Sequence, residues 1–471
     1  MSLKRVLAID LGAESGRVMS LNFDSTLFRM EEIYRFPNVP VNAGGTLNWN
    51  VLSLWHEIKT GIAKTVAHDS IGIDTWGTDF ALLDREGTLL SNPIHYRDPC
   101  TEGMIEWVLE RIPKKILYSR TGVQFMRING LYRLAYLVKN ESPLLSTAST
   151  FLTIADLFNF WLCGNKSCEF THATTQQIFN PILGDWDYET MKSLEIRTDI
   201  FPEVLQPGSK IGHYHNIPII LTASHDTASA VVSVPAIQKD FAFLSSGTWS
   251  LLGLELDELI INEDAFHANF TNEGGFAGTN RFLKNISGLW LMQQCLKTWR
   301  ENGKEYTFNH SIELAGAAPS FKAIIDPDSP EFMLAGDMPL KIINFCKNTN
   351  QSIPLSPGEI LRVIYESLAL KYRYVLELLV NISGKEVRKL HVVGGGSRNN
   401  LLNQFCANAM NIPVIAGPAE ATAFGNGLVQ LISLGEVRNI SEGREILANS
   451  VNLKIFEPQQ TELWEEQFQS F

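Results

Sequence analysis

Residues 217–227, Ile217-Pro218-Ile219-Ile220-Leu221-Thr222-Ala223-Ser224-His225-Asp226-Thr227, join an apolar run to a polar turn, and small residues follow at helical spacing from 228 to 234. An apolar run rich in Ile and Leu, then a polar turn, then a helix predicts a strand–loop–helix unit. In open α/β folds, ligands bind at the carboxyl ends of the strands. We therefore expect Asp226 to face a ligand as a catalytic base; the alternative is that Asp226 only caps the following helix.

The composition limits the class of protein. The chain has 471 residues, 45% hydrophobic and 19% charged, which is typical of a folded protein with two or three domains. The net charge of −12 favours neither nucleic acid nor an anionic membrane as a partner. No apolar run approaches the ~18 residues of a membrane-spanning helix. Without a signal-peptide pattern or a CxxC pair among the scattered cysteines, we expect a cytoplasmic protein with reduced thiols.

The first strand pattern belongs to a hairpin. Residues 5–9 and 18–23 are strand-like, and the turn between them contains Gly12 and Gly16. Such a turn lets backbone N–H groups approach an anion, with Ser15 and Arg17 as side-chain donors. Asp10, at the end of the strand, is a candidate for holding a cation or its water shell. An ordinary hairpin with a polar tip is the alternative.

Both halves of the chain carry the same succession of patterns. Residues 241–253 repeat the strand, small-residue turn and strand, and residues 390–410 form a second strand–polar loop–helix pattern around Gly394 to Arg398. This repetition predicts two domains of shared fold, 1–237 and 238–471, that face each other over one cleft. In the first domain, Trp76-Gly77 interrupts an apolar segment at 70–83, and a glycine in such a segment often marks the close approach of a ligand.

Several kinds of active site are excluded by inspection. The sequence contains no GxxxxGK[ST], HRD, DFG or HExxH motif, and the loop at Gly394 lacks the third glycine of a dinucleotide fingerprint. Ser224, His225 and Asp226 are adjacent, so their side chains cannot form a proton relay. Turns of Gly, Ser and Thr that hold phosphates, together with one carboxylate and Mg²⁺, favour phosphoryl transfer.

Several segments together resemble the FGGY carbohydrate kinases, namely 8–19, 71–80, 223–230, 244–252, 271–275, 284–285 with 288–291, 392–399 and 416–421. The resemblance implies an α/β fold of two actin/hexokinase-like (ribonuclease H-like) ATPase domains facing across a central cleft. It implies ATP-dependent phosphorylation of the 1-hydroxyl of L-rhamnulose, with Mg²⁺, by a monomer or homodimer. Phosphorylation of L-fuculose, xylulose or glycerol is the alternative within the family, and a non-catalytic sugar or nucleotide sensor is the alternative outside catalysis.

The resemblance also assigns residues. It implies that Asp226 is the base and that Asp10 helps to hold Mg²⁺. The implied sugar-binding residues are Gly77, His225, Asp226, Thr227 and Asn285, and the implied ATP-binding residues are Ala13, Glu14, Ser15, Gly16, Arg17, Thr248, Gln293 and Gly395. The chain departs from the family at Glu14, where Ser or Thr is usual, and at Cys100, where Arg is common, which leaves the role of Asp98 open.

Overall fold

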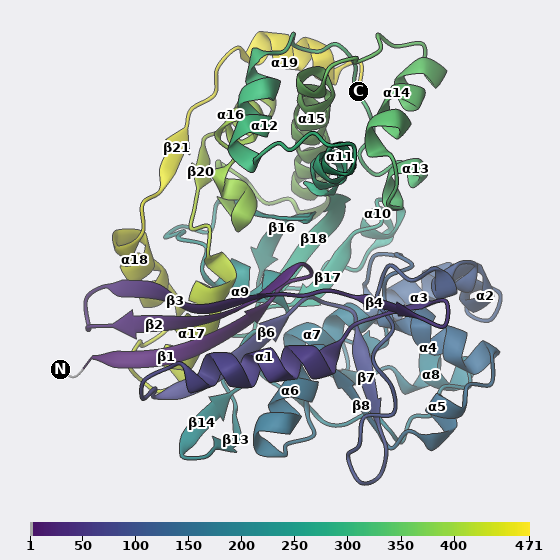
Figure 1. Ribbon diagram of the computed structural model, residues 1–471, viewed down its shortest axis with the longest axis vertical. Coiled ribbons are helices and arrows are strands. Elements are labelled where there is room, and N and C mark those ends of the chain that lie inside the picture. The colour runs from purple at the N-terminus through teal and green to yellow at the C-terminus, as the bar shows by residue number, and fades with distance from the viewer. Residues whose placement is uncertain (1–2) are drawn as a thin grey trace. The chain divides into compact units, whose positions relative to one another are not determined.

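The computed structural model describes residues 3–471, and the chain divides into two compact units (Figure 1). Unit 1 takes in the chain up to Ile237 together with Glu255–Phe282 and Ala421–Ser450. Unit 2 takes in Gln238–Leu254, Leu283–Glu420 and Val451–Phe471. The predicted domains 1–237 and 238–471 share the junction at 237 with these units but differ from them elsewhere, because two later segments pack with unit 1.

Unit 1 is a mixed α/β unit. Its strands are β1 (Lys4–Leu11), β2 (Ser15–Phe23), β3 (Phe28–Pro37), β4 (Val41–Ala43), β5 (Thr46–Asn48), β6 (Ser70–Thr75), β7 (Phe80–Leu83), β8 (Thr150–Thr153), β9 (Cys168–Glu169), β10 (Phe179–Asn180), β11 (Asp185–Trp186), β12 (Val204–Leu205), β13 (Lys210–Tyr214), β14 (Ile217–Ile220) and β17 (Thr271–Gly274). Its helices are α1 (Val51–Ala63), η1 (Pro99–Thr101), α2 (Met104–Leu109), α3 (Lys114–Thr121), α4 (Gly130–Lys139), α5 (Pro143–Thr147), α6 (Ile154–Cys163), α7 (Phe170–Ala173), η2 (Thr174–Gln176), α8 (Tyr188–Ser193), α9 (Asp226–Val232), α10 (Glu263–His267), α17 (Ala421–Ser433) and α18 (Ile440–Ser450).

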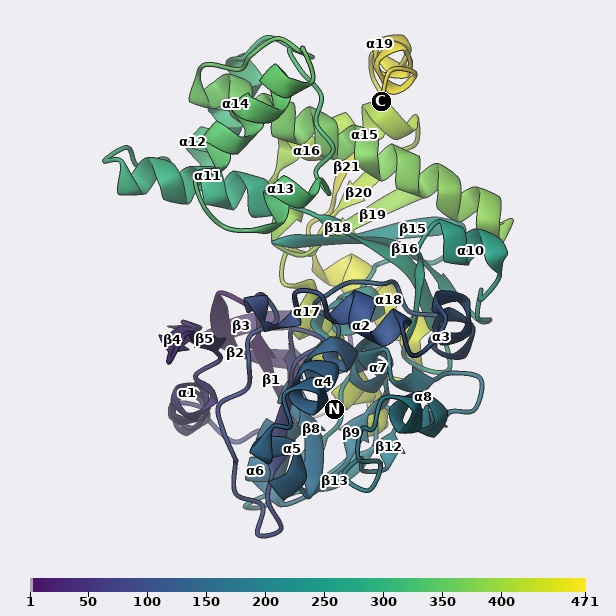
Figure 2. The ribbon, with the colours of Figure 1, turned by 90° about the vertical axis from the view of Figure 1, so that its right-hand side faces the viewer.

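The main sheet of unit 1 has the strand order β13-β14-β6-β1-β2-β3. β1 is antiparallel to β2 and parallel to β6, and β14 is parallel to β6. The central strands β1 and β6 are buried on both faces, which explains the run of consecutive apolar residues at 6–9 in β1. α17 packs against β1 and β6 on one face, and α1 against β2 and β3 on the other (Figure 2). The docking of α17 on β1 and β6 is what brings residues 421–450 into unit 1.

Unit 2 repeats this arrangement. Its strands are β15 (Phe241–Ser246), β16 (Trp249–Leu256), β18 (Asn280–Ser287), β19 (Lys389–Val393), β20 (Val414–Ala416) and β21 (Lys454–Phe456), and the boundaries at 254/255 and 282/283 fall within β16 and β18. Its helices are α11 (Trp290–Glu301), α12 (Phe308–Ala317), α13 (Pro330–Met333), α14 (Met338–Asn348), α15 (Pro357–Ser383), η3 (Gly395–Arg398), α16 (Asn400–Met410) and α19 (Thr461–Phe468).

The strand order of the second sheet matches that of the first. The sheet runs β17-β18-β16-β15-β19-β20-β21, with β15 antiparallel to β16 and parallel to β19. The segment β18-β16-β15-β19-β20 therefore has the order of β3-β2-β1-β6-β14. In both sheets the hairpin turn and the next parallel strand end at the same edge. The predicted hairpins at 5–23 and 241–253 are confirmed as β1–β2 and β15–β16.

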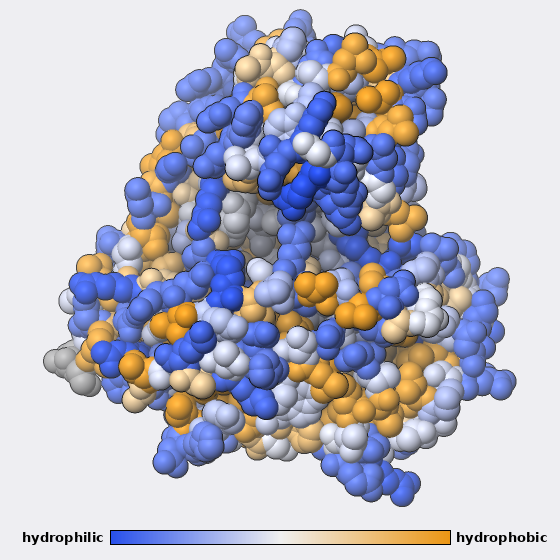
Figure 3. Space-filling model, in the orientation of Figure 1, coloured by the Kyte–Doolittle hydropathy of each residue, from blue (hydrophilic) through white to orange (hydrophobic). Residues whose placement is uncertain are grey.

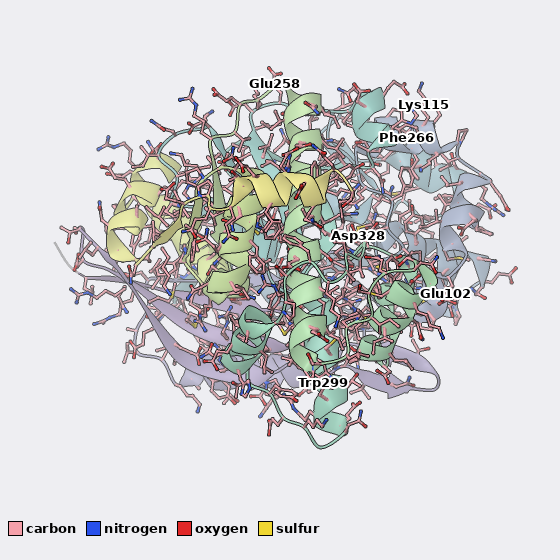
Figure 4. The ribbon with its side chains drawn as sticks, turned by 90° about the horizontal axis from the view of Figure 1, so that it is seen from above. Glu102, Lys115, Glu258, Phe266, Trp299 and Asp328 are labelled. Atoms are coloured by element: carbon pink, nitrogen blue, oxygen red, sulfur yellow. The ribbon has the colours of Figure 1, made fainter. Side chains whose placement is uncertain are left out.

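The longest helix, α15, shows how local sequence determines an element. Ser356 and Glu359 form the capping box predicted for a helix starting here, and Pro357 occupies its first position. Gly384 ends the helix with a φ of 65°, in the left-handed region that favours glycine. The helix contacts α12 and α16, and it is the long helix through the centre of Figure 4.

Hydrophilic residues cover most of the face drawn in Figure 3, and hydrophobic residues lie scattered among them. Within residues 3–471, no helix combines the length and the apolar character needed to cross a bilayer.

Candidate active site

Asp226 lies where the strand–loop–helix unit turns. The loop is fixed to the end of β6, because the backbone N–H of Thr75 donates to the carbonyl of Ser224 at 2.8 Å. His225 is the N-cap of α9, so Asp226 is its first helical residue and not the cap. Asp226 Oδ1 accepts hydrogen bonds from the N–H of Thr227 at 2.6 Å and from its hydroxyl at 3.2 Å. It also lies 3.3 Å from His225 Nε2.

Asp226 therefore uses its two oxygens differently. Every contact just described involves Oδ1, and the side chain keeps 33% of its surface exposed. Among residues 3–471, no side chain or backbone donor contacts Oδ2. The helix-cap alternative does not explain this arrangement, because the carboxylate bonds only to its immediate neighbours and keeps one oxygen available.

A second carboxylate, which the sequence analysis missed, lies beside Asp10. Asp74 is the next-to-last residue of β6 and the register partner of Asp10 on β1. Asp74 is fully buried, and its Oδ2 accepts a hydrogen bond from Asn426 Nδ2 at 2.6 Å, whereas its Oδ1 has no hydrogen-bond partner among the described residues. Burial, reinforced by the nearby Asp10, raises the pKa of Asp74 well above its ordinary value. A charged residue inside an apolar strand at the level of Asp10 was the signal that could have found it.

Asn426 belongs to a buried row of polar side chains between α17 and the sheet. Gln430 Nε2 donates to Asn426 Oδ1 at 2.7 Å and to the carbonyl of Leu7 at 3.1 Å. At the end of the row, the Ser70 hydroxyl donates to Gln430 Oε1 at 2.6 Å. Asp74, Asn426, Gln430 and Ser70 are all fully buried. The row holds β6 to α17.

The turn of the first hairpin has the tight geometry expected of it. Gly12 N–H donates to the carbonyl of Ser15 at 3.0 Å, and Asn38 fastens the turn through the carbonyls of Gly12 and Glu14. Ala13 and Ser15 are partly buried, and Glu14 is exposed, so its carboxylate does not fill the turn.

Gly16 and Arg17 have contacts within the hairpin. A Cβ at Gly16 would stand 2.3 Å from the ring of Phe36, so packing alone requires glycine there. Arg17 is the register partner of Asp10 and forms an ion pair with it. The guanidinium therefore balances the charge of a carboxylate at this edge of the sheet.

The interruption at Trp76-Gly77 has a physical cause. The chain leaves the sheet after β6, and buried Asp79 accepts hydrogen bonds from the indoles of Trp49 and Trp76 and pairs with Arg133 at 2.8 Å. The predicted single segment is therefore two strands, β6 and β7, in different sheets. The resulting bend places Gly77 against His225: a Cβ at Gly77 would stand 2.8 Å from His225 Nε2. Glycine at 77 is thus needed for the position of the imidazole.

Glu169, which the sequence analysis also missed, holds the loop that carries His225 and Asp226. Its carboxylate accepts hydrogen bonds from the N–H and the hydroxyl of Ser224, at 3.1 and 2.7 Å, and from the hydroxyl of Thr171 at 2.6 Å. Asp98, whose role was left open, accepts from the N–H groups of Cys100 and Leu47 at 2.9 and 2.6 Å. Both carboxylates hold backbone in place.

The remaining predicted residues belong to unit 2. Thr248 lies in the β15–β16 turn, where the carbonyls of Gly247 and Thr248 accept from the N–H groups of Leu289 and Trp290 at the start of α11. That helix carries Gln293, whose buried Oε1 has no hydrogen-bond partner among the described residues. These contacts hold the turn against the start of the helix.

Gly395 and Asn285 flank this region of unit 2. Gly395 follows β19, the parallel neighbour of β15, and a Cβ there would meet nothing within 4 Å, so the loop surface is open. Asn285 lies on β18 next to Lys284, whose pKa is lowered to about 8 by burial and by Lys371. Lys371 itself pairs with Asp328, which is labelled in Figure 4, at 3.2 Å.

Solved structures of similar fold are sugar and polyol kinases. The chain aligns over its whole length with gluconate kinase from Lactobacillus acidophilus, covering 97% of that chain, with a TM-score of 0.81 at 18% identity. It aligns over 99% of its length with glycerol kinase from Plasmodium falciparum, covering 96% of that chain, with a TM-score of 0.77 at 16% identity. The predicted α/β fold of two actin/hexokinase-like ATPase domains is confirmed.

Sequence comparison is more specific. Residues 5–233 match the N-terminal domain of the FGGY family of carbohydrate kinases, and residues 242–434 match its C-terminal domain. A rhamnulokinase from Bacteroides thetaiotaomicron is 41% identical over 97% of this chain and 96% of its own length. A rhamnulokinase from Enterobacter sp. is 40% identical over 97% of this chain and 95% of its own. The chain belongs to the FGGY family of carbohydrate kinases, and is thus a phosphotransferase with ATP as co-substrate and an alcohol group as acceptor.

Proposed function

We propose that the chain transfers the γ-phosphoryl group of ATP to the 1-hydroxyl of L-rhamnulose, giving L-rhamnulose 1-phosphate and ADP. The substrate is suggested by the two similar rhamnulokinases, which cover nearly all of the chain. The observation that carries the chemistry is the asymmetry of Asp226, whose Oδ1 is held by Thr227 and His225 while Oδ2 stays available.

Asp226 Oδ2 is the proposed proton acceptor. The sugar oxygen forms a bond to the γ-phosphorus, the bond from that phosphorus to the β–γ bridging oxygen breaks, and the hydroxyl proton passes to Asp226. Phosphoryl transfer has a loose transition state, so the main task of the carboxylate is to orient the hydroxyl, and the γ-phosphoryl group must be held by positive or N–H groups. In this proposal, Gly77, His225, Thr227 and Asn285 hold the sugar.

The phosphates of ATP require donors. We assign them to the turn Ala13, Glu14, Ser15, Gly16 and Arg17 and to Thr248, Gln293 and Gly395. Backbone N–H groups of a tight turn are suited to phosphate oxygens, and an open loop at Gly395 admits a nucleotide closely. Glu14 contributes backbone only, because its exposed side chain carries the wrong charge.

Residues at the edge of the first sheet fit Mg²⁺. Asp10 and the unpartnered Oδ1 of Asp74 are hard oxygen donors of the kind that Mg²⁺ prefers. Within residues 3–471 no three His, Cys, Asp or Glu side chains are grouped to hold a metal by themselves. This suits an ion that arrives with the nucleotide and keeps several waters. When bound, Mg²⁺ neutralises charge on the phosphate oxygens.

A coupled ADP-release assay tests the proposal. L-rhamnulose, L-fuculose, D-xylulose and glycerol are compared at equal concentration with ATP and Mg²⁺, and the phosphorylated product is identified by ³¹P NMR. We expect the largest kcat/KM for L-rhamnulose and a 1-phosphate product. A larger kcat/KM for another acceptor would assign the chain to that sugar. Ligand binding by calorimetry without ADP release would make it a sensor.

A further inference from the structure

The imidazole of His225 lies between two groups of charged atoms, all of them in unit 1. The side chain is 9% exposed. Its Nε2 lies 3.3 Å from Asp226 Oδ1. Its Nδ1 lies 3.3 Å from Arg281 Nη2, in hydrogen-bond geometry, and 3.5 Å from Glu273 Oε2. The ring can carry its single proton on either nitrogen, so these neighbours decide which tautomer forms.

Arg281 and Glu273 form a rigid pair. Arg281 is fully buried, its Nε donates to the carbonyl of Gly274 at 2.9 Å, and its Nη1 lies 3.1 Å from Glu273 Oε2. Burial opposes ionisation of Glu273, but the charge of Arg281 counts most among the influences that hold the pKa of that carboxyl below its ordinary value. The pair is therefore ionised, and the guanidinium is fixed by its bond to the Gly274 carbonyl and by its contact with Glu273.

The contact with Arg281 determines the tautomer. A guanidinium has donors and no acceptor, and it stays protonated in proteins, so Nδ1 must present its lone pair to Arg281 Nη2. Glu273 Oε2 competes for a proton on Nδ1, but it is the more distant of the two atoms and already faces Arg281 Nη1. The proton then lies on Nε2, which points at Asp226 Oδ1.

We propose that Arg281 and Glu273 are positioning residues that hold His225 in its Nε2–H tautomer, so that the ring donates to Asp226 Oδ1 and leaves Oδ2 for the sugar hydroxyl. This inference rests on the proposed role of Asp226 as the base. Nothing in the sequence motifs assigns a function to either residue, and both act through His225 and do not touch the sugar.

His172 and Gly77 also lie close to the ring. His172 lies on α7 with its ring centroid 6.1 Å from that of His225. Burial, and then the charges nearby, lowers the pKa of His172 well below its ordinary value, so this neighbour is uncharged. Gly77 lies against the Nε2 side of the ring, where a Cβ at position 77 would stand 2.8 Å from Nε2. Glu169 acts on Arg281 through its charge and not on the ring directly.

The test is the tautomer itself, read by long-range ¹H–¹⁵N NMR of the full chain with ¹⁵N-histidine, without substrate. The His225 signals are assigned by their loss in His225→Asn. At pH 7.5 we expect a protonated Nε2 and an unprotonated Nδ1. A wild-type spectrum with the proton on Nδ1, or on both nitrogens, would overturn the proposal, and this reading needs no other variant to fold.

Variants then connect the tautomer to catalysis. Arg281→Met removes the donor, so we expect the Nδ1–H tautomer to appear and kcat to fall about tenfold or more, with KM for ATP unchanged. Glu273→Gln keeps the shape of the pair and should retain the Nε2–H tautomer. Arg281→Lys should restore part of both the tautomer and kcat. A loss of kcat in Arg281→Met with an unchanged tautomer would also reject the proposal. If Arg281→Met shows the expected change of tautomer but the wild type does not phosphorylate L-rhamnulose, only the proposed substrate is rejected.

Discussion

Asp226 presents its two carboxylate oxygens to different surroundings, and this is the basis of the first prediction. Asp226→Asn keeps the size of the side chain but removes the proton acceptor, so kcat should fall by about two to four decades while the fold and ATP binding remain. The ADP-release assay and the melting temperature measure the two effects. Glu258→Gln, which alters an exposed acid labelled in Figure 4, is the control and should be fully active. Near-normal turnover by Asp226→Asn would remove the residue from the role of base.

Gly77 gives a second prediction at the same scale. Gly77→Ala places a Cβ where His225 Nε2 lies 2.8 Å away, so the ring must move and its contact with Asp226 must change. We expect a loss of kcat of about tenfold or more, and a higher KM for the sugar. Steady-state kinetics with varied sugar measures both.

The control for Gly77 is Gly316→Ala in α12. No heavy atom lies nearer than 4.0 Å to the added Cβ there, and Ala favours a helix, so activity and stability should be kept. If Gly77→Ala behaved like Gly316→Ala, the close approach to His225 would be irrelevant to catalysis.

The attachment of α17 to the sheet is a property of elements, and it rests on a row of buried polar groups. Asn426→Ala leaves Asp74 Oδ2 without its donor and Gln430 Nε2 without one of its acceptors. A buried polar group that loses its partner destabilises the fold by about 1–3 kcal/mol, so we expect the free energy of unfolding to fall by about 2–4 kcal/mol. Chemical denaturation followed by tryptophan fluorescence measures the change.

The loss of stability should depend on where in this row of buried polar residues a side chain is removed. Ser70→Ala removes only the outermost hydroxyl of the row, at Gln430 Oε1, and should cost about 1–2 kcal/mol. The double variant Ser70→Ala/Asn426→Ala should lower the free energy of unfolding by an amount that differs from the sum of the two single effects, because both residues bond to Gln430. Strict additivity would indicate that the row does not act as a connected network.

For the whole molecule, buried carboxyl groups predict how stability changes with pH. Burial raises the pKa of Asp156 to about 7 from an ordinary value of 3.8. The folded protein therefore binds the proton more tightly than the unfolded chain. The stability due to this group is complete below about pH 3.8 and is lost as the pH rises through about 7. The buried Asp74, Asp79 and Glu169, whose pKa values are also raised, act in the same direction.

Melting temperatures of wild type and Asp156→Asn between pH 5 and pH 8 measure this effect. The amide cannot ionise, so the variant should lose less stability than the wild type as the pH rises through this range. The two profiles should separate between pH 5 and about pH 7, the pKa of the carboxyl in the folded protein, and run parallel above it. Parallel profiles would show that Asp156 is already ionised in the folded protein at pH 5, so that burial does not raise its pKa.

The sequence by itself determined the local elements and the family. The hairpins at 5–23 and 241–253, the capping box of α15 and the loop before α9 follow from residue type and spacing over a few positions, which is where such rules apply. The repetition of patterns in both halves predicted two domains of shared fold, and the strand order of the second sheet repeats that of the first. The roles of the predicted site residues stay predictions, although the contacts of Gly77, His225 and Asp226 now give each a physical argument.

Only the tertiary structure decided which distant residues meet. Asn426 bonds to Asp74 across 352 residues of chain, and Arg281 lies against His225 across 56. The first contact arises because α17 docks on β1 and β6, which pair with each other, and such packing depends on the whole sheet and not on local sequence. For the same reason each compact unit is assembled from segments that lie far apart in the chain.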